Sequence, residues 1–86
     1  MSLQLVERGL AACVNRFGGL TSVYKWKGEL KEGTEVQLVI KTSATAVSEL
    51  IAELERLHPY ELPEIIAVPI TTGHQPYLDW IREATT

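Results

Sequence analysis

An alternating segment limits the folds open to this chain more than any other feature of its sequence. In EVQLVIK, residues 35–41, Val36, Leu38 and Ile40 fall on one side of an extended backbone, because successive side chains of a strand point to opposite faces. The other side carries Glu35, Gln37, Val39 and Lys41. We therefore expect a strand with one face in the core and one face that is wet or meets a partner.

The residues before this segment complete a hairpin. LTSVYKWK, residues 20–27, is rich in β-branched and aromatic side chains, which favour strands. The connecting GELKEG holds Gly28 and Gly33, which are typical of a turn. The sequence thus predicts a β-hairpin over residues 20–41.

Helical periodicity predicts a leading helix and a central helix. The leading helix has an apolar stripe and is closed by Asn15 and Gly18-Gly19; the stripe is Leu3, Val6, Leu10 and Cys13. The central helix spans about residues 44–57, with Ser43 or Thr45 as its N-cap and Pro59 as its stop. Its predicted buried stripe is Val47, Leu50, Ile51, Leu54 and Leu57.

The last third of the chain predicts a strand and a terminal helix. EIIAVPI, residues 64–70, reads as an apolar strand whose Pro69 confines it to a sheet edge or a bulge. An apolar edge strand needs a cover, which implies a partner subunit. The terminal helix begins at Pro76 and turns two aromatics outward onto a docking surface. Its predicted shared face is Tyr77, Trp80, Ile81 and Ala84.

The order of elements and the composition together indicate one α+β domain over residues 1–86. A split β-α-β, ferredoxin-like domain would have this pattern with one more strand in front. A single cysteine excludes an internal disulfide, and a net charge of -3 argues against a nucleic-acid partner. The chain has no apolar run long enough to cross a membrane and no signal peptide, so we expect a cytoplasmic protein without a membrane partner.

His58 is the sharpest candidate for chemistry. With Glu61 and Glu64 nearby, its imidazole could bind Cu(II) or Zn(II). The structural alternative is a helix-end His that meets the last carbonyls and the helix dipole, and no metal-ligand spacing favours the metal. Cys13 reads as a buried, inert thiol, since no cationic residue lies near it in the sequence.

Aromatic and charged residues on the hairpin suggest a ligand cleft or a subunit interface. Tyr24 and Trp26 alternate on one strand face, and aromatics are enriched at interfaces. Glu35 and Lys41 are about 20 Å apart along their strand, so each pairs across strands or subunits if it pairs at all. No nucleophile motif or phosphate-binding glycine loop is present, and we do not expect an enzyme.

Five segments, read together, resemble the CutA family of divalent-cation tolerance proteins, in register from about residue 5 to residue 83. The shared motifs are Tyr-x-Trp-x-Gly, Lys-Thr, His-Pro-Tyr-Glu-x-Pro-Glu and Tyr-Leu-x-Trp. They lie in LAACVN (10–15), SVYKWKGEL (22–30), EVQLVIKTS (35–43), HPYELPEII (58–66) and YLDWI (77–81).

This resemblance implies a trimer of ferredoxin-like subunits similar to PII-type signalling proteins. It also implies a role in tolerance of metal ions, with Cu(II) or another divalent cation as ligand. The His of His-Pro-Tyr is a proposed ligand in the family, which corresponds to His58; Glu61 is the carboxylate that we add to it. The resemblance implies no particular reaction.

The chain departs from the family pattern at its start. Family members open with a strand, normally central in the sheet, and the first half of the helix in which this chain begins. A second proposed metal ligand lies on that strand. Either the chain is a shortened form, or residues 64–70 pair directly with residues 35–41 and close the gap, because unpaired backbone groups are costly.

The sequence leaves three alternative hypotheses for the function of this protein. The first is a metal-responsive protein that uses His58 and Glu61. The second is a PII-like sensor whose small ligand sits in a cleft between subunits, and the third is a stable trimeric scaffold. The residues assigned to the cleft or interface are Tyr24, Trp26, Glu35, Lys41, Tyr60, Glu64 and Trp80.

Overall fold

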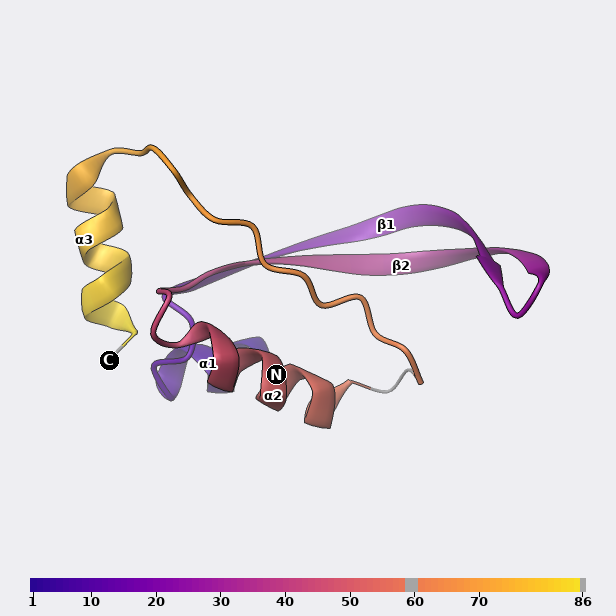
Figure 1. Cartoon of the computed structure of the whole chain (residues 1–86), viewed down its shortest axis with the longest axis horizontal. Helices are drawn as coiled ribbons and strands as arrows, with labels where there is room; N and C mark the ends of the chain where they lie inside the picture. Colours follow the sequence, from indigo (N-terminus) through magenta and orange to yellow (C-terminus); the bar gives the residue numbers. More distant parts are fainter. Residues whose placement is uncertain (59–60, 86) are drawn as a thin grey trace.

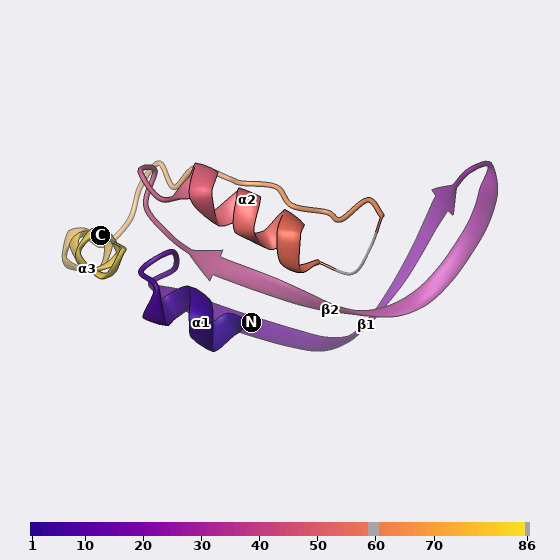
Figure 2. The same ribbon diagram turned by 90° about the horizontal axis from the view of Figure 1, so that it is seen from below.

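The computed structural model describes residues 1–58 and 61–85, and it has the predicted α+β class (Figure 1). The elements in chain order are α1 (Ser2–Glu7), β1 (Cys13–Trp26), β2 (Glu29–Lys41), α2 (Val47–Leu57) and α3 (Gln75–Ala84). Helices α1 and α2 lie side by side against one face of the β1–β2 hairpin, and α3 stands at the end away from the turn (Figures 1 and 2). No helix among the described residues is long and apolar enough to span a membrane.

The hairpin is confirmed, but its strands are longer and its turn is tighter than predicted. Trp26 pairs with Glu29, which leaves Lys27 and Gly28 as a two-residue turn. Both residues have positive φ, 51° and 81°, as a type I′ turn requires. Gly33, expected in the turn, lies inside β2 opposite Ser22.

Two glycines shift the register in the middle of β1. Phe17 pairs with Gln37 and Leu20 pairs with Glu35, so Gly18 and Gly19 together oppose the single residue Val36. This is a β-bulge, and Gly19 has the positive φ (72°) that such a site often needs. The glycines therefore bend and shift a strand, and the prediction that they close a helix is wrong.

The leading helix ends earlier than its apolar stripe predicted. The amide of Gly9 donates to the carbonyl of Val6, and the amide of Leu10 donates to that of Leu5, which is the pattern of a Schellman C-cap. Gly9 has φ 72°, the left-handed conformation this cap requires. Cys13 therefore opens β1 and is half-buried, so its predicted place on a buried helical stripe is wrong.

The core forms where α1, α2 and the start of the hairpin meet. Val14, Ile40 and Ile65 pack against a buried cluster, which comprises Leu5, Leu10, Ala11, Leu50 and Leu54. Ile40 confirms the predicted inward face at the end of β2, but Val36 of the same face is 54% exposed. Leu50 and Leu54 confirm the centre of the α2 stripe. Leu57, predicted to be buried, is 39% exposed because it is the last helical residue and lies beyond this cluster.

The boundaries of α2 differ from the prediction at one end only. Ala46 is the N-cap, and neither Ser43 nor Thr45 caps the helix with its side chain. Their hydroxyls bond to each other at 3.1 Å, and Thr85 donates to Ser43 at 2.7 Å, which ties the end of α3 to this loop. At the other end His58 is extended (φ -76°, ψ 134°), as expected of a residue before proline.

Residues 64–70 form no strand, contrary to prediction. Within the described chain the sheet has two strands, so this segment pairs with neither and the proposed closure onto residues 35–41 is wrong. This irregular segment runs alongside the hairpin and leads toward α3 (Figures 1 and 2). Ile65 packs against the core, but Ile66 and Val68 are 74% and 79% exposed. A strand needs a hydrogen-bonded neighbour, and none among the described residues pairs with this segment.

Candidate functional site

The bulge brings the hairpin residues predicted for a cleft or interface onto one face. Before the bulge, Cys13 is opposite Lys41; after it, Leu20 is opposite Glu35 and Trp26 is opposite Glu29. Directly paired residues share a face of a sheet. Residues with the face of Lys41 are therefore Cys13, Asn15 and Phe17 before the bulge, and Leu20, Ser22, Tyr24 and Trp26 after it.

This face is the one turned away from the core, because Val14 and Ile40 form the opposite pair and pack against the buried cluster. Its predicted site residues are nevertheless spread along the hairpin. Trp26 pairs at one end of β2 and Lys41 lies at the other, up to roughly 40 Å apart along an extended strand. Within a single chain, therefore, Trp26 and Lys41 do not form one cleft.

Lys41 instead lies beside the cysteine. Its Nζ is 4.0 Å from Cys13 Sγ, and Cys13 Sγ is 4.0 Å from Asn15 Oδ1. The expectation of no cationic neighbour for Cys13 was wrong, because strand pairing brings together residues that are 28 positions apart. Only the pairing register, which depends on the bulge, could have revealed this contact.

At the far end of the molecule the hairpin turn meets the corner after α2. Lys27 Nζ lies 3.8 Å from Glu61 Oε2 and 5.6 Å from the centre of the Trp26 ring. Both charged side chains are well exposed, so this ion pair adds little to stability. It does bring the aromatic end of the hairpin close to the predicted metal residues.

The predicted metal ligands are at this corner. His58 is the C-cap of α2 and is half-buried, and its backbone amide donates to Leu54 at 2.9 Å. Glu61 follows it after two residues, Pro59 and Tyr60, that lie outside the described chain, so the prediction for Tyr60 cannot be followed further. Among the described residues, no group of three or more His, Cys, Asp or Glu side chains is arranged to hold a metal ion.

A cleft of about 330 Å³ opens beside this corner. Glu61 and Glu55 supply its carboxylates, and its remaining lining is apolar: Ile51, Leu62, Pro63 and Ile65. Glu55, an exposed residue of α2, was not predicted to lie at a site. Its spacing of four residues from the apolar stripe residue Ile51 places both on one helix face, which was the available signal.

The other two predicted interface residues stay apart from this cleft. Glu64 is exposed on the extended segment. Trp80 lies on α3 beside Tyr77, with ring centres 5.5 Å apart, and both rings are partly exposed while Ile81 of the same helix is buried. The helix thus docks through Ile81 and presents an aromatic pair outward.

These features define a small α+β protein of the ferredoxin-like, PII-like class, with a hairpin whose outer face is free of the core. The chain belongs to the CutA1 divalent ion tolerance protein family, which it matches over residues 1–84. The resemblance seen in the sequence is thereby confirmed.

Named relatives and solved structures agree with this assignment. The chain is 52% identical over 81 residues to the divalent-cation tolerance protein CutA of Thermus thermophilus, covering 94% of this chain and 79% of that protein. It is 46% identical to human protein CutA, again over 94% of this chain but only 45% of the human one.

The fold matches as closely as the sequence. The structure of CutA1 from Thermus thermophilus superposes with a TM-score of 0.94 at 49% identity, covering 99% of this chain and 82% of that one. The PII-like protein CutA from Nostoc gives 0.92 at 34% identity, covering 99% and 83%.

Proposed function

We propose that this protein is a binding protein of the divalent-cation tolerance type, acting in the cytoplasm as a homotrimer, with Cu(II) or a similar divalent ion as ligand. The name of the Thermus thermophilus relative, a divalent-cation tolerance protein, supports the ion class. The observation that carries the proposal is the corner after α2, where half-buried His58 ends the helix and Glu61 lines a cleft with Glu55.

The donor chemistry fits the ion only in part. An imidazole and carboxylates suit Cu(II) and Zn(II). The described residues of one chain nevertheless assemble no set of three His, Cys, Asp or Glu donors, whereas structural zinc sites take four ligands. We infer that the remaining ligands come from a neighbouring copy, so that ion binding depends on assembly.

Exposed apolar residues support that assembly. On the hairpin they include Val23, Leu30 and Val36, and on α3 they include Tyr77 and Trp80. Large apolar side chains left exposed in this number on one chain favour an interface with another copy. A trimer would also bring the outer faces of several hairpins together. Tyr24, Trp26, Glu35 and Lys41, which are spread along the hairpin of one chain, could then line one cleft between subunits.

The test is a Cu(II) titration of the assembled protein, followed by calorimetry and by native mass spectrometry. His58→Ala is expected to weaken Cu(II) binding by about tenfold or more, because an inner ligand is lost. The matched control is His74→Ala, which removes the other histidine, exposed at the N-cap of α3. If both variants lose the same affinity for Cu(II) while the assembly stays intact, the binding is that of any exposed histidine, and the proposal is contradicted.

A further inference from the structure

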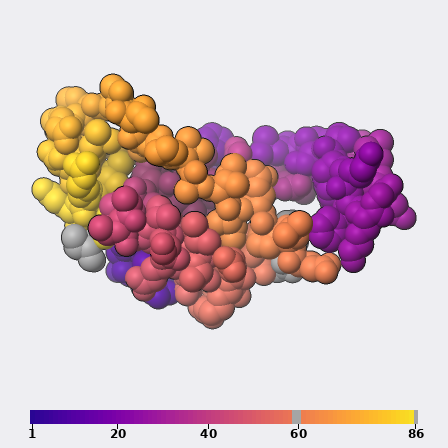
Figure 3. All heavy atoms as spheres, in the orientation of Figure 1, coloured from indigo at the N-terminus to yellow at the C-terminus, as the bar shows by residue number. Residues whose placement is uncertain are grey.

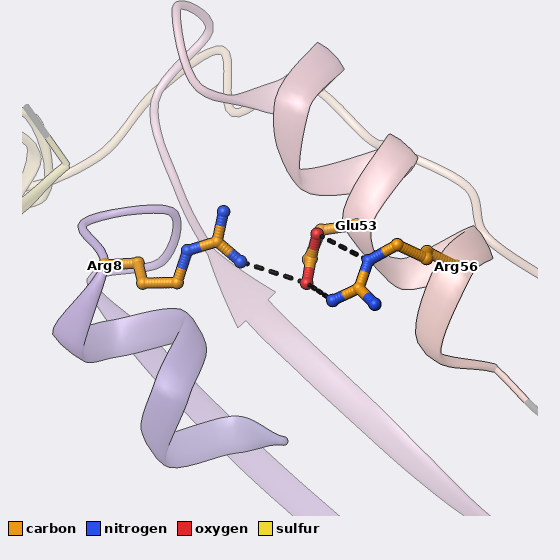
Figure 4. Close-up of polar contacts among 3 residues, drawn as sticks. All are labelled: Arg8, Glu53 and Arg56. Carbon is orange, nitrogen blue, oxygen red and sulfur yellow. Dashed lines mark hydrogen bonds and ion pairs between the residues drawn. The ribbon is translucent and has the colours of Figure 1, made fainter.

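Two arginines from different helices converge on one carboxylate between α1 and α2 (Figure 4). Arg8, the C-cap of α1, places Nη1 3.0 Å from Glu53 Oε1. Arg56 lies one turn after Glu53 on α2; its Nε donates to Oε2 at 3.3 Å, and its Nη2 contacts the same Oε1 atom. A single oxygen thus holds both guanidinium groups.

The charges of this cluster do not balance. Two guanidiniums carry two positive charges and Glu53 carries one negative charge, which leaves one positive charge. The hydrogen bond from Arg56, together with the charges of Arg56 and Arg8, holds the pKa of Glu53 below its usual value, so the carboxylate is ionised at neutral pH. The residual positive charge is therefore a permanent property of the site.

The positive groups of the cluster are exposed to solvent, whereas its carboxylate is largely buried. The Glu53 side chain is only 13% exposed, whereas those of Arg8 and Arg56 are 48% and 66% exposed. A guanidinium has five N–H donors. The contacts with Glu53 occupy one nitrogen of Arg8 and two of Arg56, so N–H groups of both forks remain for a further acceptor.

A cleft adjoins the two forks. Its volume is about 350 Å³, and it is lined by Met1, Gln4, Arg8, Glu53, Arg56 and Leu57. The lining thus combines two guanidiniums and one carboxamide with apolar side chains of Met1 and Leu57, and it contains a single carboxylate. A second anion entering here would relieve the repulsion between two like charges that one carboxylate only half compensates.

We propose that this cleft binds a phosphate monoester with an apolar substituent. A dianionic phosphate offers three acceptor oxygens, enough to engage two guanidinium forks at once, and Arg matches this geometry well. The apolar substituent would lie against Leu57. The site lies between α1 and α2, on the helix side of the hairpin (Figure 2). The strand pairing places Tyr24, Trp26 and Lys41 on the other side of the hairpin. None of His58, Glu55 and Glu61 lines this cleft, so the proposal does not depend on the metal function proposed above.

The experiment uses phenyl phosphate as the probe, in calorimetry and in NMR of the arginine Nε–Hε signals, at low ionic strength where screening is weakest. We expect saturable binding, with shifts in the Arg8 and Arg56 signals. Arg8→Gln and Arg56→Gln should each weaken binding by roughly tenfold or more, because each removes charge-assisted hydrogen bonds.

Arg82→Gln is the matched control. Arg82 also pairs with a carboxylate three residues earlier, Asp79 at 3.3 Å, on an exposed face of a helix, but the described structure gives it no second guanidinium there. This variant should bind phenyl phosphate as the wild type does. Absence of saturable binding, or equal weakening by Arg82→Gln, would overturn the proposal.

Two more arms distinguish the ligand class. Inorganic phosphate binding as tightly as phenyl phosphate would overturn the role of the apolar wall, and benzoate binding as tightly would overturn the preference for phosphate. If Arg8→Gln fails to fold by circular dichroism, Arg8→Lys keeps the charge and loses the fork. Retained wild-type affinity in Arg8→Lys would contradict recognition by the fork.

Discussion

Gly9 shows how the conformation of a single residue determines where a helix ends. The apolar residues around it continue at helical spacing, yet the chain leaves the helix because Gly9 adopts φ 72° and the Schellman cap closes. The cap also puts Leu5 and Leu10 in contact with the same core cluster. Gly9 thus marks the end of the helix. A glycine inside a continuing helix would give the same sequence pattern, and only the left-handed conformation of Gly9 distinguishes the two cases.

Gly9→Ala is expected to lower the free energy of unfolding by about 1 kcal/mol, because a Cβ is disfavoured at this φ. Urea denaturation followed by circular dichroism measures it. Gly18→Ala serves as the control, since Gly18 lacks a positive φ and a Cβ there would meet nothing within 4 Å. A Gly9→Ala protein no less stable than Gly18→Ala would contradict the role of the cap.

At the scale of elements, local pattern predicted what local contacts determine. The hairpin and the centre of α2 follow from alternation and helical spacing, and both formed. The strand predicted at residues 64–70 did not form, because its existence depends on a neighbour elsewhere in the chain rather than on its own apolar residues. The contact between Lys41 and Cys13 likewise could not be predicted from local sequence, since it follows from the register in which β1 pairs with β2. His58 and Glu61 were predicted from sequence as metal ligands and stay a prediction, while Glu55 and the Arg8–Glu53–Arg56 cluster were not predicted.

The α2 stripe gives a second prediction. Leu50→Ala should cost about 2–5 kcal/mol of unfolding free energy, because Leu50 is 5% exposed in the core cluster. Leu57→Ala, on the same helix but 39% exposed, should cost roughly 1 kcal/mol or less. Chemical denaturation of both variants measures the difference, and similar costs would mean that Leu57 is covered in the native protein.

At the scale of the whole molecule, one chain leaves much apolar surface uncovered. The structure is elongated, 45 × 26 × 20 Å, and its hairpin turn and α3 lie at opposite ends (Figure 3). Both ends carry tryptophans, Trp26 near the turn and Trp80 on α3. Such a shape suits a subunit that reaches across to its neighbours better than one that functions alone.

We therefore expect native mass spectrometry to find a trimer, and expect the double variant Trp26→Ala, Trp80→Ala to dissociate it, because large aromatics dominate interface energies. Leu3→Ala is the control, since Leu3 is an exposed apolar residue on α1 outside both aromatic surfaces. A monomeric wild type, or a double variant that remains fully trimeric, would contradict this assembly.

The bulge at Gly18 and Gly19 also governs which changes in hairpin length the protein can tolerate. Deleting one glycine would remove the bulge and restore simple alternation, with the remaining glycine opposite Val36 and with Tyr24 and Trp26 still on the outer face. Adding one residue to one strand between the bulge and the turn would instead turn the residues beyond it toward the side of the hairpin that the helices occupy. Between the bulge and the turn, length variants that preserve the outer surface must therefore change each strand by an even number of residues, or carry a second bulge that compensates. Parity of length, more than the identity of any residue in the distal hairpin, determines what that surface presents.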